Sequence, residues 1–378
     1  MWPESDESPR PLRSGYTTGC CATACCVAAA QSLLAQRQPG KVDVSLPRGK
    51  VAEIIIEGYE SIENDESNEG DEKIEGGVRT STIKDAGDDP DVTHGATVFV
   101  ELRLVKDKGI QFSAAKGVGT VTRTGLVLEV GEPAINPVPR KMMTEHLQKA
   151  AYTYQYDGGF EVSVGVEGGE QIAQKTMNSR LGILGGLSIL GTTGIVRPYS
   201  CAAYIASIHQ GIDVCKSNGI THIAATTGST SEKAIASHYQ LSDMALIEMG
   251  DFVGAVLKYL KKVPLGKLSI CGGFGKISKL ANGHMDLNSR ASAIDLDRLG
   301  ELAKQAGADP VLVKQVQSAN TSIEALNACQ KADVDLAALV CAEALMKARR
   351  IVPDSVELEV WATDRKGNFV GSAHEIER

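Results

Sequence analysis

The densest cluster of glycines lies in the middle of the chain, between residues 168 and 194, and it limits what this region can form. An alternating apolar run over residues 160–166 precedes the cluster and predicts a β-strand. Each glycine costs conformational entropy on folding unless its backbone freedom or its missing side chain is used. A strand, a turn at Gly168 and Gly169, and a helix that begins near Glu170 would expose backbone N–H groups to a ligand. The stretch therefore predicts a binding loop. The candidate ligand-binding side chains on this loop are Asn178, Arg180, Thr192 and Thr193.

The length of the chain predicts two domains, because 378 residues exceed the usual size of a domain with a single hydrophobic core. In residues 1–195, strand-like and helix-like runs are mixed irregularly, which is typical of an α+β domain. From about residue 200, short apolar strands alternate with helices, and this rhythm indicates βαβ units with a parallel sheet. We therefore expect a mixed α+β domain over residues 1–195 and a Rossmann-like α/β domain over residues 196–378.

Local signals place the elements of the first domain. Thr17 and Thr18 offer hydroxyl caps for a helix over residues 20–36, and Pro137 marks the approach to a helix over residues 140–154. The expected strands are 42–46 and 51–57, joined as a hairpin, together with 97–105, 126–130 and 160–166.

In the second domain the elements alternate more regularly. The expected helices are 200–218, 231–239, 252–260, 297–306, 310–318 and 335–347, and the expected strands are 220–225, 244–249 and 268–271. Two further strand-like runs lie between residues 356 and 373. The sequence leaves open whether these runs extend the second sheet or return to the first domain.

Three loops leave the carboxyl ends of the expected parallel strands, at residues 226–232, 250–254 and 272–276. In open parallel sheets, ligands bind outside these strand ends. A single loop of this kind is explained by a tight turn, whereas three on one edge of a sheet indicate a pocket. The predicted binding residues of this edge are Thr227, Gly228, Asp251, Gly273, Lys276 and Lys279.

The negative charge of the chain is concentrated in one segment. Residues 57–75 contain nine acidic residues and one lysine, which leaves −8, equal to the net charge of the whole chain. This composition predicts a solvated insertion loop near residues 57–78, since the acidic spacing of an EF-hand is absent. An acidic chain with 4% aromatic residues also argues against nucleic acid as a partner.

Four of the nine cysteines crowd one expected helix, at Cys20, Cys21, Cys25 and Cys26. No second cluster completes a zinc site, so no metal is expected, and small thiols packed in a reducing cytoplasm explain the pattern better. The N-terminus lacks the pattern of a signal peptide, and no run of about eighteen apolar residues predicts a membrane span. We expect a cytoplasmic protein, and the sequence leaves a homo-oligomer open.

Several familiar catalytic motifs are missing. Residues 272–276 lack the earlier glycine of a Walker sequence, because Ile270 stands in its place. The chain has no G-x-G-x-x-G dinucleotide fingerprint and no G-x-S-x-G nucleophile turn. The residues alone indicate a two-domain enzyme or binding protein with an anion-handling pocket.

Rare strings give a more specific indication. They are Arg13–Gly19 (RSGYTTG), Lys84–Asp91 (KDAGDDPD), Gly117–Thr122 (GVGTVT), Ala134–Arg140 (AINPVPR) and the glycine-rich stretch 168–194. Together they resemble the cobalt-precorrin-5B C1-methyltransferases of anaerobic cobalamin biosynthesis, over roughly residues 12–283. The resemblance implies transfer of a methyl group from S-adenosylmethionine to ring carbon C1 of a cobalt-bearing corrin precursor, with cobalt present only as part of the substrate.

The resemblance also implies where ligands bind. Within the matching strings, the substrate- or donor-binding candidates are Thr17, Thr18, Asn136, Arg140, Gly168, Gly169 and Glu170. Asp88 and Asp89 are weak catalytic candidates that could steady the sulfonium or the ribose, but turn formation explains them almost as well. The chain departs from the family pattern at Asp251, where asparagine is usual, and at Asn288, where a histidine is expected. A nucleotide-dependent phosphotransferase and a non-catalytic tetrapyrrole-binding protein stay open as alternatives.

Overall fold

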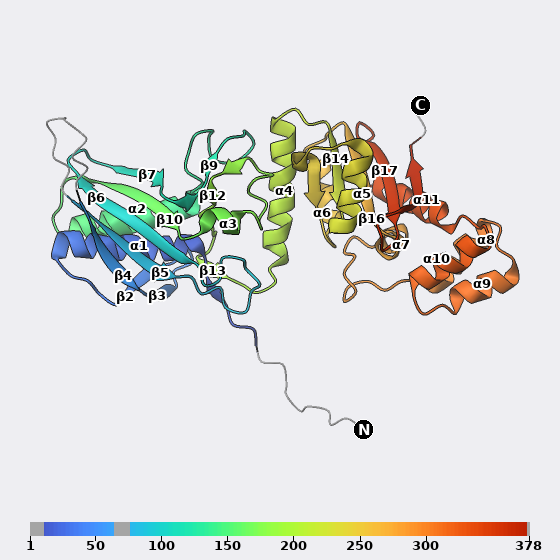
Figure 1. The fold of residues 1–378 in the computed structure, drawn as a ribbon, viewed down its shortest axis with the longest axis horizontal. Helices are drawn as coiled ribbons and strands as arrows, with labels where there is room; N and C mark the ends of the chain where they lie inside the picture. The colour runs from blue at the N-terminus through green and yellow to red at the C-terminus, as the bar shows by residue number, and fades with distance from the viewer. Residues whose placement is uncertain (1–10, 64–75, 376–378) are drawn as a thin grey trace, which may run out of the picture. The chain divides into compact units, whose positions relative to one another are not determined.

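The computed structural model describes residues 11–63 and 76–375. Contacts divide the chain into two compact units, Met1–Cys201 and Ala202–Arg378, called unit 1 and unit 2 below. Both units combine helices with sheets, so the chain is a mixed α/β protein (Figure 1).

Unit 1 is built on a five-stranded sheet that is antiparallel except for one pair. Strand β10 lies between β6, to which it is antiparallel, and β7, to which it is parallel. The buried positions of β10 alternate with less buried ones, which gives the sheet one apolar face. Across the sheet the strands are β4 (Gly58–Ile62), β5 (Gly77–Ile83), β6 (Thr97–Val105), β10 (Gly159–Val166) and β7 (Ile110–Ala114).

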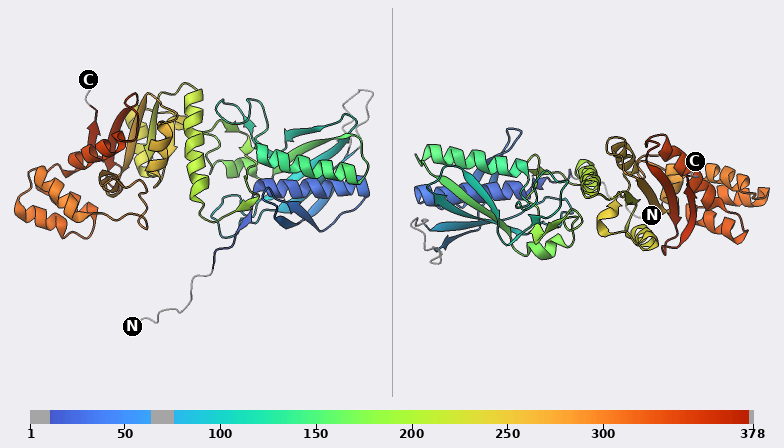
Figure 2. Two further views of the ribbon diagram at one scale, coloured as in Figure 1. Left: turned by 180° about the vertical axis from the view of Figure 1, so that it is seen from behind. Right: turned by 90° about the horizontal axis from the view of Figure 1, so that it is seen from above.

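Two helices pack side by side on this sheet, α1 (Thr18–Ala35) and α2 (Pro137–Thr153) (Figures 1 and 2). Thr17 caps α1 by accepting a hydrogen bond from the backbone N–H of Cys20 at 3.2 Å. The buried face of α1 consists of small residues, which lets the two helices approach closely. The hairpin of β2 (Lys41–Ser45) and β3 (Val51–Ile55) covers a further side of α1.

Helix α1 also has the length and the mean hydropathy, 1.5, of a membrane span, which the sequence prediction overlooked. Its environment gives a different explanation, because 67% of that window is buried inside unit 1. Its cysteines and alanines pack against the sheet and α2. The helix is therefore apolar because it forms the core of the unit.

The glycine-rich segments of unit 1 form short strand pairs and one short helix. β8 (Gly117–Val118) pairs in parallel with β12 (Gly186–Leu187), and the turn after β10 leads into α3 (Gly169–Ala173). The remaining pairs are β1 (Gly15–Tyr16) with β13 (Ile195–Val196) and β9 (Thr120–Val121) with β11 (Ile183–Leu184).

Two predictions for unit 1 are wrong. Residues 126–130 form bends and a turn, because Val127 and Val130 are exposed and have no neighbouring strand to pair with. The acidic segment 57–78 is not a loop at its ends, since β4 and β5 pair there in antiparallel register. The middle of that predicted loop, residues 64–75, lies outside the described residues.

Unit 2 contains an open five-stranded sheet in which four strands are parallel and the last is antiparallel. The runs near the C-terminus extend this sheet, because β17 pairs with β16 and β18 pairs with β17. Across the sheet the strands are β15 (Leu246–Glu248), β14 (His222–Thr226), β16 (Lys267–Gly273), β17 (Glu357–Thr363) and β18 (Phe369–His374).

Helices cover both faces of the unit 2 sheet. One apolar face, with Ile223, Ile270 and Val360, packs against α4, α6, α7 and α11. The opposite face packs Ala224 and Cys271 against α5. The helices are α4 (Cys201–Ser217), α5 (Ser229–Tyr239), α6 (Val253–Leu260), α7 (Phe274–Ala281), α8 (Leu296–Gln305), α9 (Pro310–Gln317), α10 (Ser322–Lys331) and α11 (Leu336–Arg349), with a 3₁₀ turn at Asp243–Ala245.

Two helices of unit 2 were not predicted from the sequence. Residues 274–276, expected as loop, open α7, and α10 lies in a stretch that the sequence analysis left unassigned. Both helices position the site described next.

Candidate functional site

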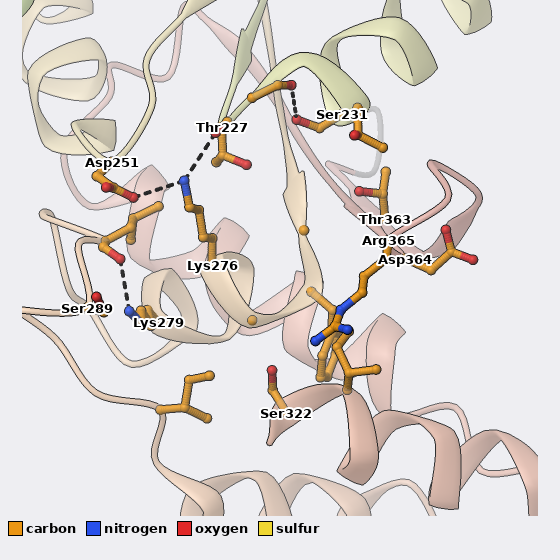
Figure 3. Close-up of a pocket in the computed structure, with 18 of the residues that line it drawn as sticks. Thr227, Ser231, Asp251, Lys276, Lys279, Ser289, Ser322, Thr363, Asp364 and Arg365 are labelled. Carbon is orange, nitrogen blue, oxygen red and sulfur yellow. Dashed lines mark hydrogen bonds and ion pairs between the residues drawn. The ribbon is translucent and has the colours of Figure 1, made fainter. Parts of the chain in front are cut away.

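A pocket of about 670 Å³ lies at the carboxyl ends of the parallel strands of unit 2 (Figure 3). From β14 the chain passes through α5 to β15 on one side, then through α6 to β16 on the other side of β14. The loops after β14 and β16 therefore diverge and leave a crevice between them. This site is called the edge pocket below. Its lining residues are Thr227, Gly228, Ser229, Thr230, Ser231, Asp251, Gly273, Phe274, Gly275, Lys276, Lys279, Leu287, Asn288, Ser289, Ile294, Ser322, Ile323, Thr363, Asp364 and Arg365.

Six predicted residues come together in the edge pocket, five from the three loops and Lys279 just beyond the third: Thr227, Gly228, Asp251, Gly273, Lys276 and Lys279. Gly228 and Gly273 border open space, since a Cβ added at either would meet no atom within 4 Å. They stand just before α5 and α7, and neither residue provides a side-chain cap for its helix. A ligand can therefore approach the backbone of both turns closely.

Lys276 connects the ends of three neighbouring strands. Its Nζ lies 3.0 Å from Asp251 Oδ1, beyond the end of β15, and donates a hydrogen bond of 3.1 Å to the Thr227 carbonyl after β14. Lys276 itself lies in the first turn of α7, which follows β16. The pair with Asp251 is partly exposed, with 36% and 25% of the two side chains accessible, so solvent screens it and its contribution to stability is small.

Lys279 lies one turn further along α7 and is committed to the protein. Only 7% of the residue is exposed, and its Nζ donates a hydrogen bond of 2.9 Å to the Leu287 carbonyl. This bond holds the segment after α7 against the pocket wall. Lys279 therefore shapes the pocket, and its ammonium group is engaged by a protein carbonyl.

The Asp251 carboxylate has one satisfied and one incompletely satisfied oxygen. Oδ2 accepts a hydrogen bond of 3.2 Å from Asn288 Nδ2. Oδ1 is buried, and although Lys276 is close, its approach is not aligned as a hydrogen bond, so Oδ1 lacks a hydrogen-bond donor within the described part of the chain. The two positions at which the sequence analysis expected other residues, Asp251 and Asn288, are thus in direct contact.

A turn after β17 supplies the remaining wall, through Thr363, Asp364 and Arg365. Sequence reasoning missed these residues because it did not establish that residues 356–363 join the same sheet. Once β17 is placed beside β16, the rule that selected the other three loops selects this one as well. Ser322 and Ile323 were missed for a different reason, since α10 was not predicted.

In unit 1, the predicted residues at the helix starts mostly serve the fold. Thr18 exchanges two hydrogen bonds with the backbone of Leu190, and the Asn136 N–H donates to the Ile189 carbonyl at 2.9 Å. Arg140 donates to the carbonyls of Ile135 and Pro133 and forms an ion pair with Glu132 at 2.8 Å. These contacts tie the starts of α1 and α2 to neighbouring loops.

Glycines in the glycine-rich stretch of unit 1 also have structural roles. A Cβ on Gly169 would lie 2.2 Å from the Gly117 carbonyl oxygen, so the two backbones are in direct contact. Gly168 has a φ of 63°, which favours glycine, and Glu170 lies half-buried in the first turn of the five-residue helix α3. The prediction that these residues bind a ligand stays a prediction, because close packing explains Gly169 and the positive φ explains Gly168.

The polar side chains of that stretch are divided between structure and surface. Asn178 is 8% exposed and donates a hydrogen bond of 3.1 Å to the Gly186 carbonyl. Thr193 bonds to the backbone of Ile195, whereas Thr192 is exposed. Arg180 is half-buried on the loop between α3 and β11.

The acidic string 84–91 forms a turn whose carboxylates hold the backbone. Asp88 accepts a hydrogen bond from the Arg13 N–H at 2.6 Å, and Asp89 accepts one from the Tyr199 N–H at 2.7 Å. Lys84, of which 1% of the side chain is exposed, pairs with Asp91. These contacts match turn formation, the second explanation that the sequence offered for Asp88 and Asp89.

Comparison with known proteins gives the family. The family model described as CbiD matches residues 5–198, and the model for the CbiD C-terminal domain matches residues 286–374. The chain belongs to the CbiD family. The resemblance inferred from the rare strings is therefore confirmed.

Curated relatives of this CbiD-family chain are similar over nearly its whole length. A protein of Marinomonas sp. (strain MWYL1) is 65% identical over 99% of this chain and 97% of its own, and one of Burkholderia cenocepacia (strain HI2424) is 58% identical over 99% and 100%. Both are named cobalt-precorrin-5B C(1)-methyltransferase. A crystal structure of a cobalamin biosynthesis protein from Archaeoglobus fulgidus is 29% identical, covers 70% of this chain and 78% of that one, and has a TM-score of 0.38.

Proposed function

We propose that this CbiD-family chain methylates ring carbon C1 of cobalt-precorrin-5B, with S-adenosylmethionine as the methyl donor and cobalt-precorrin-6A as the product. The observation that carries the proposal is the 65% identity, over 99% of the chain, to a relative named for this reaction. Cobalt belongs to the substrate in this proposal and is not a resident cofactor.

The edge pocket is the proposed donor site, within a Rossmann-like unit 2. In such sheets the nucleotide lies where the strand order reverses, and a carboxylate about 20 residues beyond the first turn hydrogen-bonds the ribose. The strand order here reverses between β14 and β16, and Asp251 follows the glycine turn at Gly228 after a similar interval. The cavity volume lies within the range of about 300–1,000 Å³ typical of small-molecule sites.

The polarity of the pocket fits a nucleoside better than a polyphosphate. Ser229, Thr230 and Thr363, which carry hydroxyl groups, are among its lining residues, and the buried Oδ1 of Asp251 is an acceptor with no hydrogen-bond donor in the described chain. Both lysines of the pocket are engaged by protein oxygens, so among the described lining residues a polyphosphate would find only the Arg365 cation available. A ribose hydroxyl would supply the missing hydrogen-bond donor to Asp251 Oδ1 if it lies beside the Lys276 ammonium group or displaces it.

The chemistry requires orientation more than a catalytic group. The methyl carbon bonds to C1 through an electron pair of the macrocycle as its bond to sulfur breaks. The sulfur keeps the electron pair of the broken bond and becomes neutral, and the positive charge passes to the macrocycle. Because the sulfonium already activates the methyl group, a protein that holds donor and acceptor in line can supply about 7–11 kcal/mol through positioning alone. In this proposal no side chain acts as a nucleophile, and Asp88 and Asp89 keep their backbone contacts.

All nine cysteines are free thiols, which supports the proposed cytoplasmic setting.

The test is a calorimetric titration of the protein with S-adenosylhomocysteine, with and without a cobalt corrin. Saturable binding in either state is expected. A companion assay supplies S-adenosylmethionine with a deuterated methyl group and measures transfer to the substrate by mass spectrometry. Corrin binding without any binding of the donor product would instead favour a carrier, and a magnesium-dependent thermal shift with ATP would favour a phosphotransferase.

A further inference from the structure

The cations that line the edge pocket differ in whether they have partners. Lys276 is held by Asp251 and the Thr227 carbonyl, and Lys279 is buried against the Leu287 carbonyl. Arg365 lines the same pocket and is exposed, and it has no hydrogen-bond or ion-pair partner among residues 11–63 and 76–375. The pocket therefore contains a guanidinium whose donors are available to a ligand.

The turn that presents Arg365 is fixed by its neighbour. Asp364 Oδ1 accepts the backbone N–H groups of Lys366 at 2.8 Å and Asn368 at 2.9 Å, and Oδ2 accepts the Asn368 side chain at 2.8 Å. Burial alone would raise the pKa of Asp364, but these hydrogen bonds outweigh it and lower the pKa below its usual value. Gly367, with a φ of 89°, completes the turn. Asp364 is thus committed to the turn and does not neutralise Arg365.

The side chain of Arg365 extends into the pocket. Figure 3 shows it reaching from the turn at Thr363–Arg365 toward the space that the Ser322 hydroxyl faces, on the opposite side of the pocket from Asp251. Ser322 begins α10 and comes close to α7, since a Cβ on Gly275 would lie 2.7 Å from its Oγ. The pocket thus presents a carboxylate on one wall, and the Arg365 guanidinium and Ser322 among its other lining groups.

We propose that Arg365 binds a carboxylate group of the ligand that occupies the edge pocket. A guanidinium holds a carboxylate through two parallel, charge-assisted hydrogen bonds, which a lysine cannot do. Resting on the function proposed above, the carboxylate is that of the amino-acid end of S-adenosylmethionine, with the ribose toward Asp251. An acetate or propionate group of the corrin precursor presents the same chemistry, and the experiment separates the two sources.

The experiment compares Arg365→Gln with a matched control, Lys366→Gln. Lys366 is the adjacent exposed cation in the same turn and does not line the pocket. Calorimetry on the full chain measures the affinity for S-adenosylhomocysteine, for 5′-methylthioadenosine, which lacks the carboxylate, and for cobyrinic acid, a cobalt corrin with free carboxylates. Thermal melts of all variants report on folding. Arg365→Lys tests whether the planar guanidinium, with its two parallel hydrogen bonds, is needed.

The expected result is that Arg365→Gln weakens S-adenosylhomocysteine binding by about tenfold or more. Methylthioadenosine binding and the melting temperature should not change. Arg365→Lys should fall between the wild type and Arg365→Gln, and Lys366→Gln should match the wild type. A loss confined to cobyrinic acid would assign the same carboxylate role to the corrin.

Two outcomes would contradict the inference in different ways. If the wild type binds S-adenosylhomocysteine and Arg365→Gln binds it and cobyrinic acid equally well, Arg365 has no carboxylate role while the proposed function stands. If the wild type binds no S-adenosylhomocysteine, with or without corrin, the proposed function fails and this assignment of the donor carboxylate fails with it.

Discussion

The glycines of unit 1 and those of the edge pocket look alike in the sequence and do different things in the fold. Around Gly117, the backbones of Gly169 and Gly186 come so close that a Cβ on either would lie within 2.4 Å of a backbone atom. At the edge pocket, Gly228 and Gly273 face open space. A glycine can be required because nothing else fits or because a ligand must approach, and only the surroundings distinguish the two cases.

The largest expected effect comes from Gly186→Ala in unit 1. The added methyl would lie 2.3 Å from the Gly117 carbonyl atoms, and backbone cannot rotate away as a side chain can. We expect a loss of about 3 kcal/mol or more in the free energy of unfolding. Urea denaturation followed by circular dichroism measures it, with hydrogen exchange to localise the loss to unit 1.

Gly228→Ala is the matched change at the open edge. Its backbone is extended, with a φ of 161°, which any residue adopts, so the unfolding free energy should change by no more than about 0.5 kcal/mol. Similar losses for the two variants would break the comparison between packed and open glycines.

The strands and edge loops of unit 2 could be predicted from the sequence, whereas the packing role of the unit 1 glycines could not. Apolar runs near β14 and β16 carry a local signal, and the rule for parallel sheets then brings their loops to one edge. The contact of Gly169 with Gly117 joins positions 52 residues apart, which no local pattern reveals. The place of β17, and with it Arg365, depends in the same way on a distant partner strand. Local periodicity therefore found half of the pocket and missed the wall that required long-range pairing.

A second comparison lies within unit 2, between two carboxylates. Glu359, in the middle of β17, is 1% exposed and accepts hydrogen bonds from Tyr239 at 2.8 Å and Trp361 at 2.9 Å, beside an ion pair with Lys267 at 2.9 Å. Burial would raise its pKa, but these contacts and the Ser269 hydroxyl lower it from 4.5 to about 2. Asp251, by contrast, keeps an oxygen without a hydrogen-bond donor in the described chain.

This difference predicts that Glu359 makes stability depend on pH. Because its pKa is lower in the folded state, its contribution is fully present above pH 4.5 and is lost as the pH falls from 4.5 toward 2. Glu359→Gln should cost about 1.5–3 kcal/mol at neutral pH, the range for hydrogen bonds to charged groups. It should also flatten the acid limb of the stability profile. Urea titrations followed by Trp361 fluorescence at several pH values test this, and an unchanged acid limb would contradict it.

Asp251→Ala, which removes both side-chain oxygens, should affect ligand binding and leave the fold intact. The ion pair with Lys276 is partly exposed, so its loss should change the unfolding free energy by at most about 1 kcal/mol. If the carboxylate accepts a ribose hydroxyl, affinity for S-adenosylhomocysteine should fall by about tenfold. Glu248→Gln, at the exposed end of β15 shortly before Asp251, is the control. Equal affinities for both variants would remove Asp251 from the donor site.

The smallest expected effect returns to the glycine-rich stretch of unit 1. Arg180 is half-buried on the loop between α3 and β11, close to Gly182, where an added Cβ would lie 2.1 Å from the Arg123 side chain. If that loop also binds a corrin carboxylate, Arg180→Lys keeps the charge but loses the paired geometry, and the Michaelis constant for the corrin substrate should rise by about fivefold. Folding and S-adenosylhomocysteine affinity should not change, because the donor site proposed here lies in unit 2. An unfolded variant, or an unchanged Michaelis constant, would leave the stretch with packing as its sole function and would make the contrast between the two sets of glycines complete.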